Sequence, residues 1–175
     1  MIKQFTIQEL VKEFHWILGE IDEQAFINLL VPIHTDLELF DVYYKGDKLH
    51  NPNGPVICVP ELAEIWYLND KRHNPNGPAL VYADGSQEWW LDDKRHNPNG
   101  PAITHADGSQ EWWLKGKLHN PNGPAIVWAD GSEFWYLDNK LHNPNGPAIT
   151  QADGSEYWYL DDKQIEKPEC LLMIN

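Results

Sequence analysis

The stretch HNPNGPALVYADGSQEWWLDDKR, residues 73–95, is followed from residue 96 by a second copy of nearly the same sequence. Its opening motif, HNPNGP, occurs five times at a constant spacing of 23 residues, beginning at His50, His73, His96, His119 and His142. Self-similarity at such a period is typical of proteins that stack one small structural unit many times. The repeat is therefore the unit from which fold and function are predicted.

Each repeat predicts a β-hairpin. Four repeats carry an Asp-Gly step between runs of β-branched and aromatic residues, at Asp84-Gly85, Asp107-Gly108, Asp130-Gly131 and Asp153-Gly154. Asp-Gly favours a two-residue type I′ turn, because Asp tolerates a positive φ and Gly accepts it freely. A second short turn is predicted at Asp92-Asp93 and its equivalents, before the Pro and Gly of the next HNPNGP motif interrupt the ladder.

The predicted loop length decides which residues share a face of the sheet. If Asp84 and Gly85 are the whole loop, Leu80 pairs with Trp89 across the ladder. The aliphatic position and the unvaried tryptophan would then form the core. The aliphatic residues are Ile57, Leu80, Ile103, Ile126 and Ile149, and the tryptophans are Trp66, Trp89, Trp112, Trp135 and Trp158.

The opposite face is predicted to bind a partner, because its residues vary between repeats. In the second repeat it would show Ala79, Val81, Glu88 and Trp90. Exposed aromatic residues are typical of binding surfaces. The candidate binding residues are Tyr67, Glu88, Trp90, Glu111, Trp113, Trp128, Phe134, Tyr136, Tyr157 and Tyr159.

The segment before the repeats predicts a different structure. Thr6 and Glu9 match a capping box at the start of an amphipathic helix over residues 6–20. A second helix is expected from residue 21 and should end before Pro32. Residues 35–44 predict a strand, with 37–45 as a half-unit that starts the sheet. The predicted organisation is a helical cap and first strand over 1–44, five repeats over 45–164, and a tail over 165–175, where Ile165 replaces the expected histidine.

The repeat resembles the MORN repeat and the MORN-variant repeats found in bacterial antitoxin-like and viral proteins. The matching residues are Trp113, Gly116, His119, Gly123, Asp130 and Gly131, and the resemblance covers residues from about 45 to 164. The sequence departs from the family pattern where His-Asn-Pro-Asn-Gly replaces His-Gly-x-Gly, and where Asp93, Asn139 and Asp162 stand at the turn glycine. The resemblance implies an elongated sheet of consecutive hairpins that binds other proteins.

Composition restricts the class of partner. The 175 residues carry a formal net charge of −14, which disfavours direct contact with nucleic acid or an anionic membrane and favours a basic protein. The N-terminal residues are too charged for a secretory signal, and no apolar run approaches the roughly 20 residues of a membrane span. A cytoplasmic location, in a bacterial cell or a phage-infected host, is expected. The oligomeric state stays open, a homodimer included.

The repeat histidines are predicted to be structural, with a ring nitrogen bonded to the Asn-Pro-Asn-Gly corner and the ring covering the tryptophan. Equivalent residues of neighbouring hairpins lie roughly 9 to 10 Å apart, whereas each ligand of one metal ion lies ~2.1 Å from it. Neither a metal site nor a cofactor is expected. Ser86, Ser109, Ser132 and Ser155 follow Asp-Gly as ordinary turn residues, so no enzyme is predicted.

Three functions remain open at this point. The favoured one is stoichiometric binding and inhibition of a protein, as an antitoxin-like immunity factor or a phage inhibitor of a bacterial defence protein. The first alternative is a glycan or small-molecule binder that uses the aromatic face. The second is an acidic DNA mimic that blocks a nuclease or a CRISPR effector.

Overall fold

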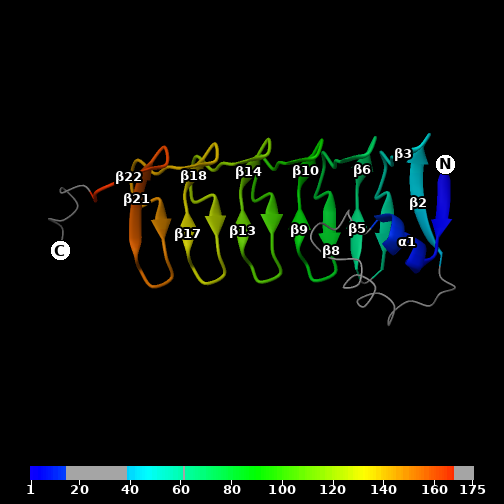
Figure 1. The fold of residues 1–175 in the computed structure, drawn as a ribbon, viewed down its shortest axis with the longest axis horizontal. Helices are drawn as coiled ribbons and strands as arrows, with labels where there is room; N and C mark the ends of the chain where they lie inside the picture. Colours follow the sequence, from blue (N-terminus) through cyan, green and yellow to red (C-terminus); the bar gives the residue numbers. More distant parts are fainter. Residues whose placement is uncertain (15–38, 61, 168–175) are drawn as a thin grey trace.

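The structure, a computed structural model, describes residues 1–14, 39–60 and 62–167. The repeats form consecutive antiparallel hairpins that follow one another along a single elongated sheet, with the N-terminal strand at one end of the row and the last described strand at the other (Figure 1). The predicted fold class, a mainly β linear array of hairpins, is confirmed. No helix in the described ranges is both long and apolar enough to span a membrane.

The main sheet has 14 strands in nearly sequential order. Along the sheet they are β1 (Ile2–Phe5), β2 (Phe40–Lys45), β4 (Ile57–Val59), β5 (Ala63–Ile65), β8 (Leu80–Tyr82), β9 (Gln87–Glu88), β12 (Ile103–Thr104), β13 (Gln110–Glu111), β16 (Ile126–Val127), β17 (Glu133–Phe134), β20 (Ile149–Thr150), β21 (Glu156–Leu160) and β22 (Lys163–Ile165), with β3 (Lys48–Leu49) paired to β2 alone. Because neighbours in sequence are neighbours in space, each repeat pairs mainly with the next.

Small two-stranded hairpins continue four of the repeats along one edge of the row (Figure 1). They pair β6 (Tyr67–Leu68) with β7 (Lys71–Arg72), β10 (Trp90–Leu91) with β11 (Lys94–Arg95), β14 (Trp113–Leu114) with β15 (Lys117–Leu118), and β18 (Tyr136–Leu137) with β19 (Lys140–Leu141). Their loops contain two residues of positive φ, for example Asp92 at 51° and Asp93 at 59°. These are the type I′ turns of the repeat.

The Asp-Gly loops have a different conformation from the predicted one. Only Gly85 has a positive φ, of 90°, and its N–H donates to Tyr82 O at 3.0 Å, while Tyr82 N donates to Ser86 O at 2.9 Å. This is a three-residue loop, a type I turn closed by a glycine in the left-handed region. The Asp84 carboxylate accepts the Ser86 N–H at 2.8 Å and so stabilises this turn.

The longer loop moves the second strand of each hairpin by one position. Leu80 pairs with Glu88, and Ile103 pairs with Glu111 in the same way, so the predicted pairing of Leu80 with Trp89 is wrong. A shift of one residue moves every side chain of a strand to the other face. Leu80, Glu88, Trp90 and their equivalents therefore form one face, called here the helix face. Ala79, Val81, Trp89 and their equivalents form the other, called the corner face.

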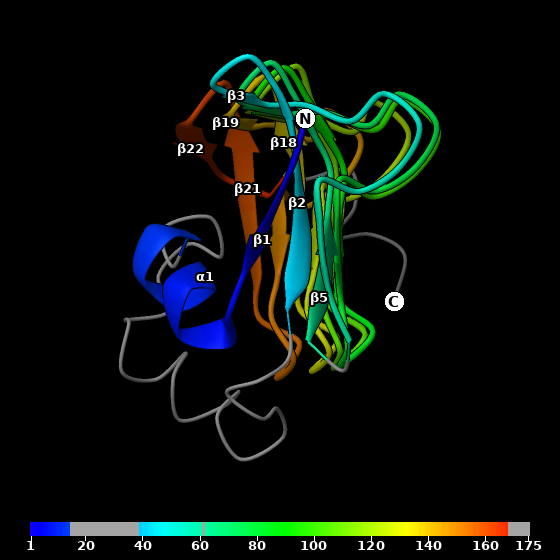
Figure 2. The same ribbon diagram turned by 90° about the vertical axis from the view of Figure 1, so that its right-hand side faces the viewer.

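The hydrophobic core lies near the N-terminal end of the row, chiefly on the helix face, with Val56 and Ala79 added from the corner face. Helix α1 (Ile7–Phe14) packs on the helix face, as the view along the row shows (Figure 2), and contributes Ile7 and Leu10. The other core residues are Phe40, Val42, Leu49, Val56, Ile57, Val59, Leu62, Ala63, Ile65, Tyr67, Ala79, Leu80 and Trp90. Further along, the described buried hydrophobic residues are only Ala102, Ile103, Ala125, Ala148 and Trp158.

The five repeat tryptophans that were predicted to form the core are therefore mostly outside it. Trp66, Trp89, Trp112 and Trp135 are half-buried, and only Trp158 of this set is buried. In the first two repeats the neighbouring aromatic residues, Tyr67 and Trp90, are buried instead. The prediction failed because it depended on the two-residue Asp-Gly loop.

The N-terminal segment confirms one prediction and corrects another. Thr6 N donates to Glu9 Oε2 at 2.8 Å and Glu9 N donates to Thr6 Oγ1 at 3.3 Å, which is the predicted capping box. The Thr6 N–H, together with the Thr6 hydroxyl, which also donates to Glu9 Oε2 at 3.0 Å, holds the pKa of Glu9 below its usual value. However, β1, which was not predicted, precedes the helix and pairs with β2, so the half-unit at 37–45 does not start the sheet. The second predicted helix and residues 15–38 lie outside the described residues.

Polar clamps join each repeat to the next. In the type I′ turn, Asp93 N donates to Arg72 O at 3.1 Å and the Asp93 carboxylate accepts the Arg72 N–H at 2.9 Å. Asp70, Asn139 and Asp162 accept a backbone N–H in the same way. At the Asp-Gly loop, Ser86 Oγ accepts the N–H of Ala106 at 3.0 Å. These bonds explain why Asp or Asn stands where the MORN pattern has glycine.

A pH dependence follows from the burial of Tyr67. Burial raises the pKa of Tyr67 to about 12, against the lowering effect of Arg72. Because the folded state favours the neutral phenol, its contribution to stability is present below about pH 10 and is lost as pH rises from 10 to 12. We expect urea midpoints to fall over this window, and to fall less in Tyr67→Phe. Identical declines in both proteins would contradict this assignment.

Candidate functional site

The ten candidate binding residues all lie on the helix face. Four of them pair with the aliphatic residues of this face: Glu88 with Leu80, Glu111 with Ile103, Phe134 with Ile126 and Tyr157 with Ile149. Side chains alternate along a strand, so the aromatic residue two positions later in each repeat lies on the same face. The sequence therefore grouped them correctly. It was wrong to separate them from the aliphatic residues, which share this face, and to include Ala79 and Val81, which lie on the other.

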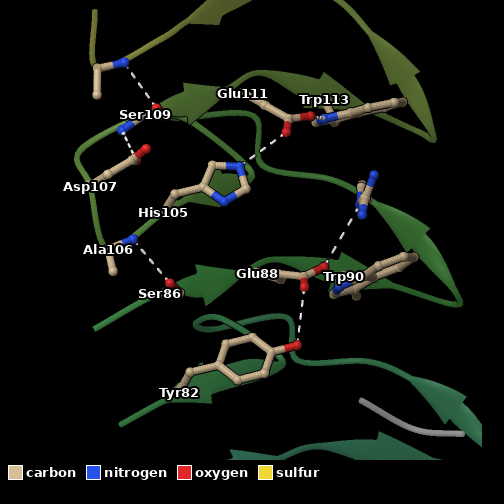
Figure 3. A network of polar contacts seen from close by, with 12 residues as sticks. Tyr82, Ser86, Glu88, Trp90, His105, Ala106, Asp107, Ser109, Glu111 and Trp113 are labelled. Carbon is tan, nitrogen blue, oxygen red and sulfur yellow. Dashed lines mark hydrogen bonds and ion pairs between the residues drawn. The ribbon is translucent and has the colours of Figure 1, made fainter. Parts of the chain in front are cut away.

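Glu88 is the centre of a polar network in the second repeat (Figure 3). It accepts hydrogen bonds from Tyr82 Oη at 3.2 Å and from Trp90 Nε1 at 3.0 Å, and Arg95 Nε lies 3.7 Å from Glu88 Oε2. Burial and the neighbouring Glu88 carboxylate raise the pKa of Tyr82, so its hydroxyl stays a donor at neutral pH. The network fixes the Trp90 indole on this face.

The third repeat has the same arrangement with one change. Glu111 accepts from Trp113 Nε1 at 2.8 Å, and His105 Nε2 lies 3.1 Å from the other Glu111 oxygen, in the position that Tyr82 occupies one repeat earlier (Figure 3). The His105 ring also approaches Trp128, with 6.3 Å between ring centroids. Side chains of the third and fourth repeats thus meet on the helix face.

Two arginines link these networks, and sequence reasoning missed both. The Arg72 guanidinium lies 3.7 Å from the centroid of the Trp90 ring, and Arg95 lies 5.2 Å from both Trp90 and Trp113. Such contacts are favourable cation–π interactions. The sequence did contain a signal for these arginines. The residue directly before the HNPNGP histidine is arginine at Arg72 and Arg95, whereas it is leucine at the other three motifs, at Leu49, Leu118 and Leu141.

A shallow hollow of about 340 Å³ opens beside the stacked rings. It is lined by two tryptophans, three basic residues and one acidic residue: Trp90, Trp113, Lys94, Arg95, Lys115 and Asp93. The Nε atom of Arg95 is buried without a hydrogen-bond partner in the described residues. This part of an acidic protein is therefore locally cationic and aromatic.

The helix face becomes more open toward the C-terminal repeats. Leu80 and Ile103 are buried, whereas Ile126 and Ile149 at the same repeat position are half-buried. Trp128 and Tyr157 are each 38 % exposed. The register aligns Ile126, Phe134, Ile149 and Tyr157 across neighbouring strands. A row of partly exposed apolar side chains of this kind is typical of a protein-binding surface.

The repeat histidines contact a different partner from the predicted one. The Nδ1 atom of His73 lies 3.0 Å from an Asp92 carboxylate oxygen, and that of His119 accepts the backbone N–H of Asp138 at 3.3 Å. These contacts reach a turn 19 residues ahead rather than the corner. The first asparagine secures the corner instead, since Asn74 Nδ2 donates to Pro78 O at 2.8 Å and Asn74 Oδ1 accepts from Asn76 N at 3.1 Å. The predicted bond from the histidine ring to its own corner is therefore wrong.

The nearest approach to a catalytic arrangement is His105 with Glu111. A hydrolase would need a nucleophile beside the histidine. The neighbouring Ser109 is almost fully buried, and its Oγ accepts the backbone N–H of Ala129 at 2.9 Å, which makes it a clamp between repeats. Within the described ranges, no three His, Cys, Asp or Glu side chains are placed to hold one metal ion.

A comparison with models of known protein families found no match, and a comparison with curated protein sequences found no similar protein.

Proposed function

We propose that this protein is a non-catalytic binding protein that acts by occupying one partner protein with its helix face. The observation that supports this most directly is the gradient along that face. The same repeat positions form a core beside α1 and an exposed aromatic strip with Trp128 and Tyr157 further on. A rigid row of hairpins presents those side chains in fixed positions, so little conformational entropy is lost on binding.

The chemistry of the face favours a basic partner with apolar anchors. Tryptophan, tyrosine and arginine dominate the energetics of protein interfaces, and the face carries all three. The net charge of −14 steers a basic protein toward it. The resemblance to MORN-type repeats agrees with this role, and inhibition of a toxin or a defence protein in a bacterial or phage setting is the form that we propose.

The two alternatives receive less support. A DNA mimic requires a continuous pattern of carboxylates, yet Arg72 and Arg95 lie over the tryptophans in the middle of the helix face. A glycan site on this face requires free polar groups beside the rings, yet the Glu88 and Glu111 carboxylates are bonded to the indoles and to their neighbours.

The test combines capture and titration. The protein is used as bait in bacterial lysate, and any protein captured is purified and titrated by calorimetry. We expect saturation at a fixed ratio, no covalent change in the partner, and affinity weakened about tenfold or more by the double substitution Trp128→Ala, Tyr157→Ala. The matched control is Gln87→Ala on the corner face, which should bind normally.

Two outcomes would contradict the proposal. One is inhibition of the partner at far below one molecule per target, which would require turnover. The other is normal binding by the folded double variant, which would place the interface elsewhere. Repeating the capture at high salt separates a charge-driven interface, which is lost, from an aromatic one, which is retained.

A further inference from the structure

The corner face carries furrows that the proposed function does not use. One, of about 560 Å³, lies between the corners at 51–54 and 74–76, and another, of about 300 Å³, lies between those at 97–100 and 120–122. Trp66, Leu68 and His73 line the first. Trp112, Leu114 and His119, each 46 residues or two repeats later, line the second. The furrow is thus a property of the repeat, and the five corners of the sequence imply four of them.

The spacing of the furrows is set by the sheet. Each repeat adds two strands to the row, so successive furrows lie roughly 9.4 to 9.8 Å apart. Viewed along the row, the corners of the earlier repeats nearly overlap and those of the later repeats are offset by a gradual twist, so each corner stays close to line with the next (Figure 2). A polyproline II helix rises about 3.1 Å per residue with three residues per turn, roughly 9.3 Å per turn. Such a chain can place every third residue in the next furrow with little accumulated error.

The furrow offers the groups that a polyproline II chain needs. The backbone carbonyls of a polyproline II chain accept no hydrogen bonds within the chain, so they require donors from the protein that binds it. The indole N–H of Trp66 and that of Trp112 have no hydrogen-bond partner in the described part of the chain and are not buried, whereas those of Trp90 and Trp113 donate to glutamates on the other face. Aromatic-lined grooves with such donors are a recurring means of recognising proline-rich segments.

Charge selects among proline-rich segments. At one side of three of the four furrows the histidine contacts a turn aspartate, as His73 contacts Asp92 and His119 contacts Asp138. At the remaining furrow His96 Nδ1 accepts the backbone N–H of Lys115 instead. The side chains of these two aspartates are 63 % and 61 % exposed, and Asp161 occupies the equivalent place beside His142. An exposed carboxylate therefore stands beside three of the four furrows, where it complements a lysine or arginine of the ligand, and Lys115 stands beside the fourth.

We propose that the corner face is a second binding surface, for a basic proline-rich segment in the polyproline II conformation that lies along the row with one turn per repeat. The prolines pack on the tryptophans, the indole N–H groups donate to the peptide carbonyls, and the basic side chains pair with the turn aspartates. This surface is independent of the helix face and of the partner proposed there.

The test is a fluorescence anisotropy titration of the full chain with labelled (Pro-Pro-Lys)n peptides of two to five units. Each added unit up to four should tighten binding about fivefold, because it engages another furrow. A peptide of the same composition with its lysines grouped at one end keeps the charge but breaks the period, and should bind at least tenfold more weakly. Equal binding of the two peptides, or no gain with length, would overturn the proposal.

Two adjacent residues provide the matched variants. Trp112→Phe keeps an aromatic ring but removes the donor in the furrow, and should weaken the peptide about fivefold while leaving binding through the helix face unchanged. Trp113→Phe makes the same change on the other face, and should leave the peptide unaffected. Equal effects of the two substitutions, or binding of neutral oligosaccharides in place of the peptides, would also overturn the proposal.

Discussion

Ile57→Ala should lower the free energy of unfolding by about 2 to 5 kcal/mol. Ile57 is only 3 % exposed, pairs with Val42 and Ile65 across the sheet, and belongs to the cluster that α1 covers. Removal of its side chain leaves a cavity in the best-packed part of the molecule. The loss is measured by urea unfolding, followed by circular dichroism.

The matched control is Ile149→Ala, which makes the same change at the same repeat position. Ile149 is half-buried, because the helix face is open in the fifth repeat. Less apolar contact is lost there, so the expected cost is below about 1.5 kcal/mol. Equal costs at the two sites would show that the helix face is covered along its whole length, and the proposed binding surface would then be wrong.

Glu88→Ala should cost about 2 to 4 kcal/mol of stability, although it removes a charge from a strongly acidic protein. The substitution leaves the Tyr82 hydroxyl and the Trp90 indole N–H without their acceptor, and it also removes the carboxylate nearest to Arg95. Hydrogen bonds to a charged group are each worth about 1.5 to 3 kcal/mol, and partly buried donors that lose their partner are costly.

The neighbouring Gln87→Ala serves as the control for this prediction. Gln87 is exposed on the corner face, so its truncation should change stability by no more than about 0.5 kcal/mol. Glu88→Gln should fall between the two, since the amide oxygen can still accept one of the hydrogen bonds. Urea midpoints for Glu88→Ala no lower than those for Gln87→Ala would show that the network does not fix the Trp90 ring.

The two stability predictions describe one gradient. At the N-terminal end the sheet is stabilised by burial against α1, and further along it relies on hydrogen bonds between repeats, such as the serine clamp from Ser109 to Ala129. This division leaves the later repeats ordered by hydrogen bonds while their helix face stays partly exposed. A binding surface needs both properties, since side chains that are ordered before binding lose less entropy on contact.

The sequence alone determined the 23-residue unit, the succession of hairpins, the capping box at Thr6 and the grouping of the candidate binding residues, because all of these depend on spacing within one repeat or one helical turn. It could not decide the Asp-Gly loop, since Asp and Gly suit both a two-residue and a three-residue turn. Side chains alternate with a period of two, so that single residue decided which face is the core.

Other features depended on contacts between distant residues. The pairing of β1 with β2 joins Phe5 to Phe40, and no local pattern in residues 2–5 indicated a strand. Two further features form only when side chains of adjacent repeats come together. They are the furrows between corners and the cation–π contacts among Arg72, Trp90, Arg95 and Trp113. Local propensity specifies one hairpin, whereas burial by α1 and the stacking of neighbours determine what each face of that hairpin contacts.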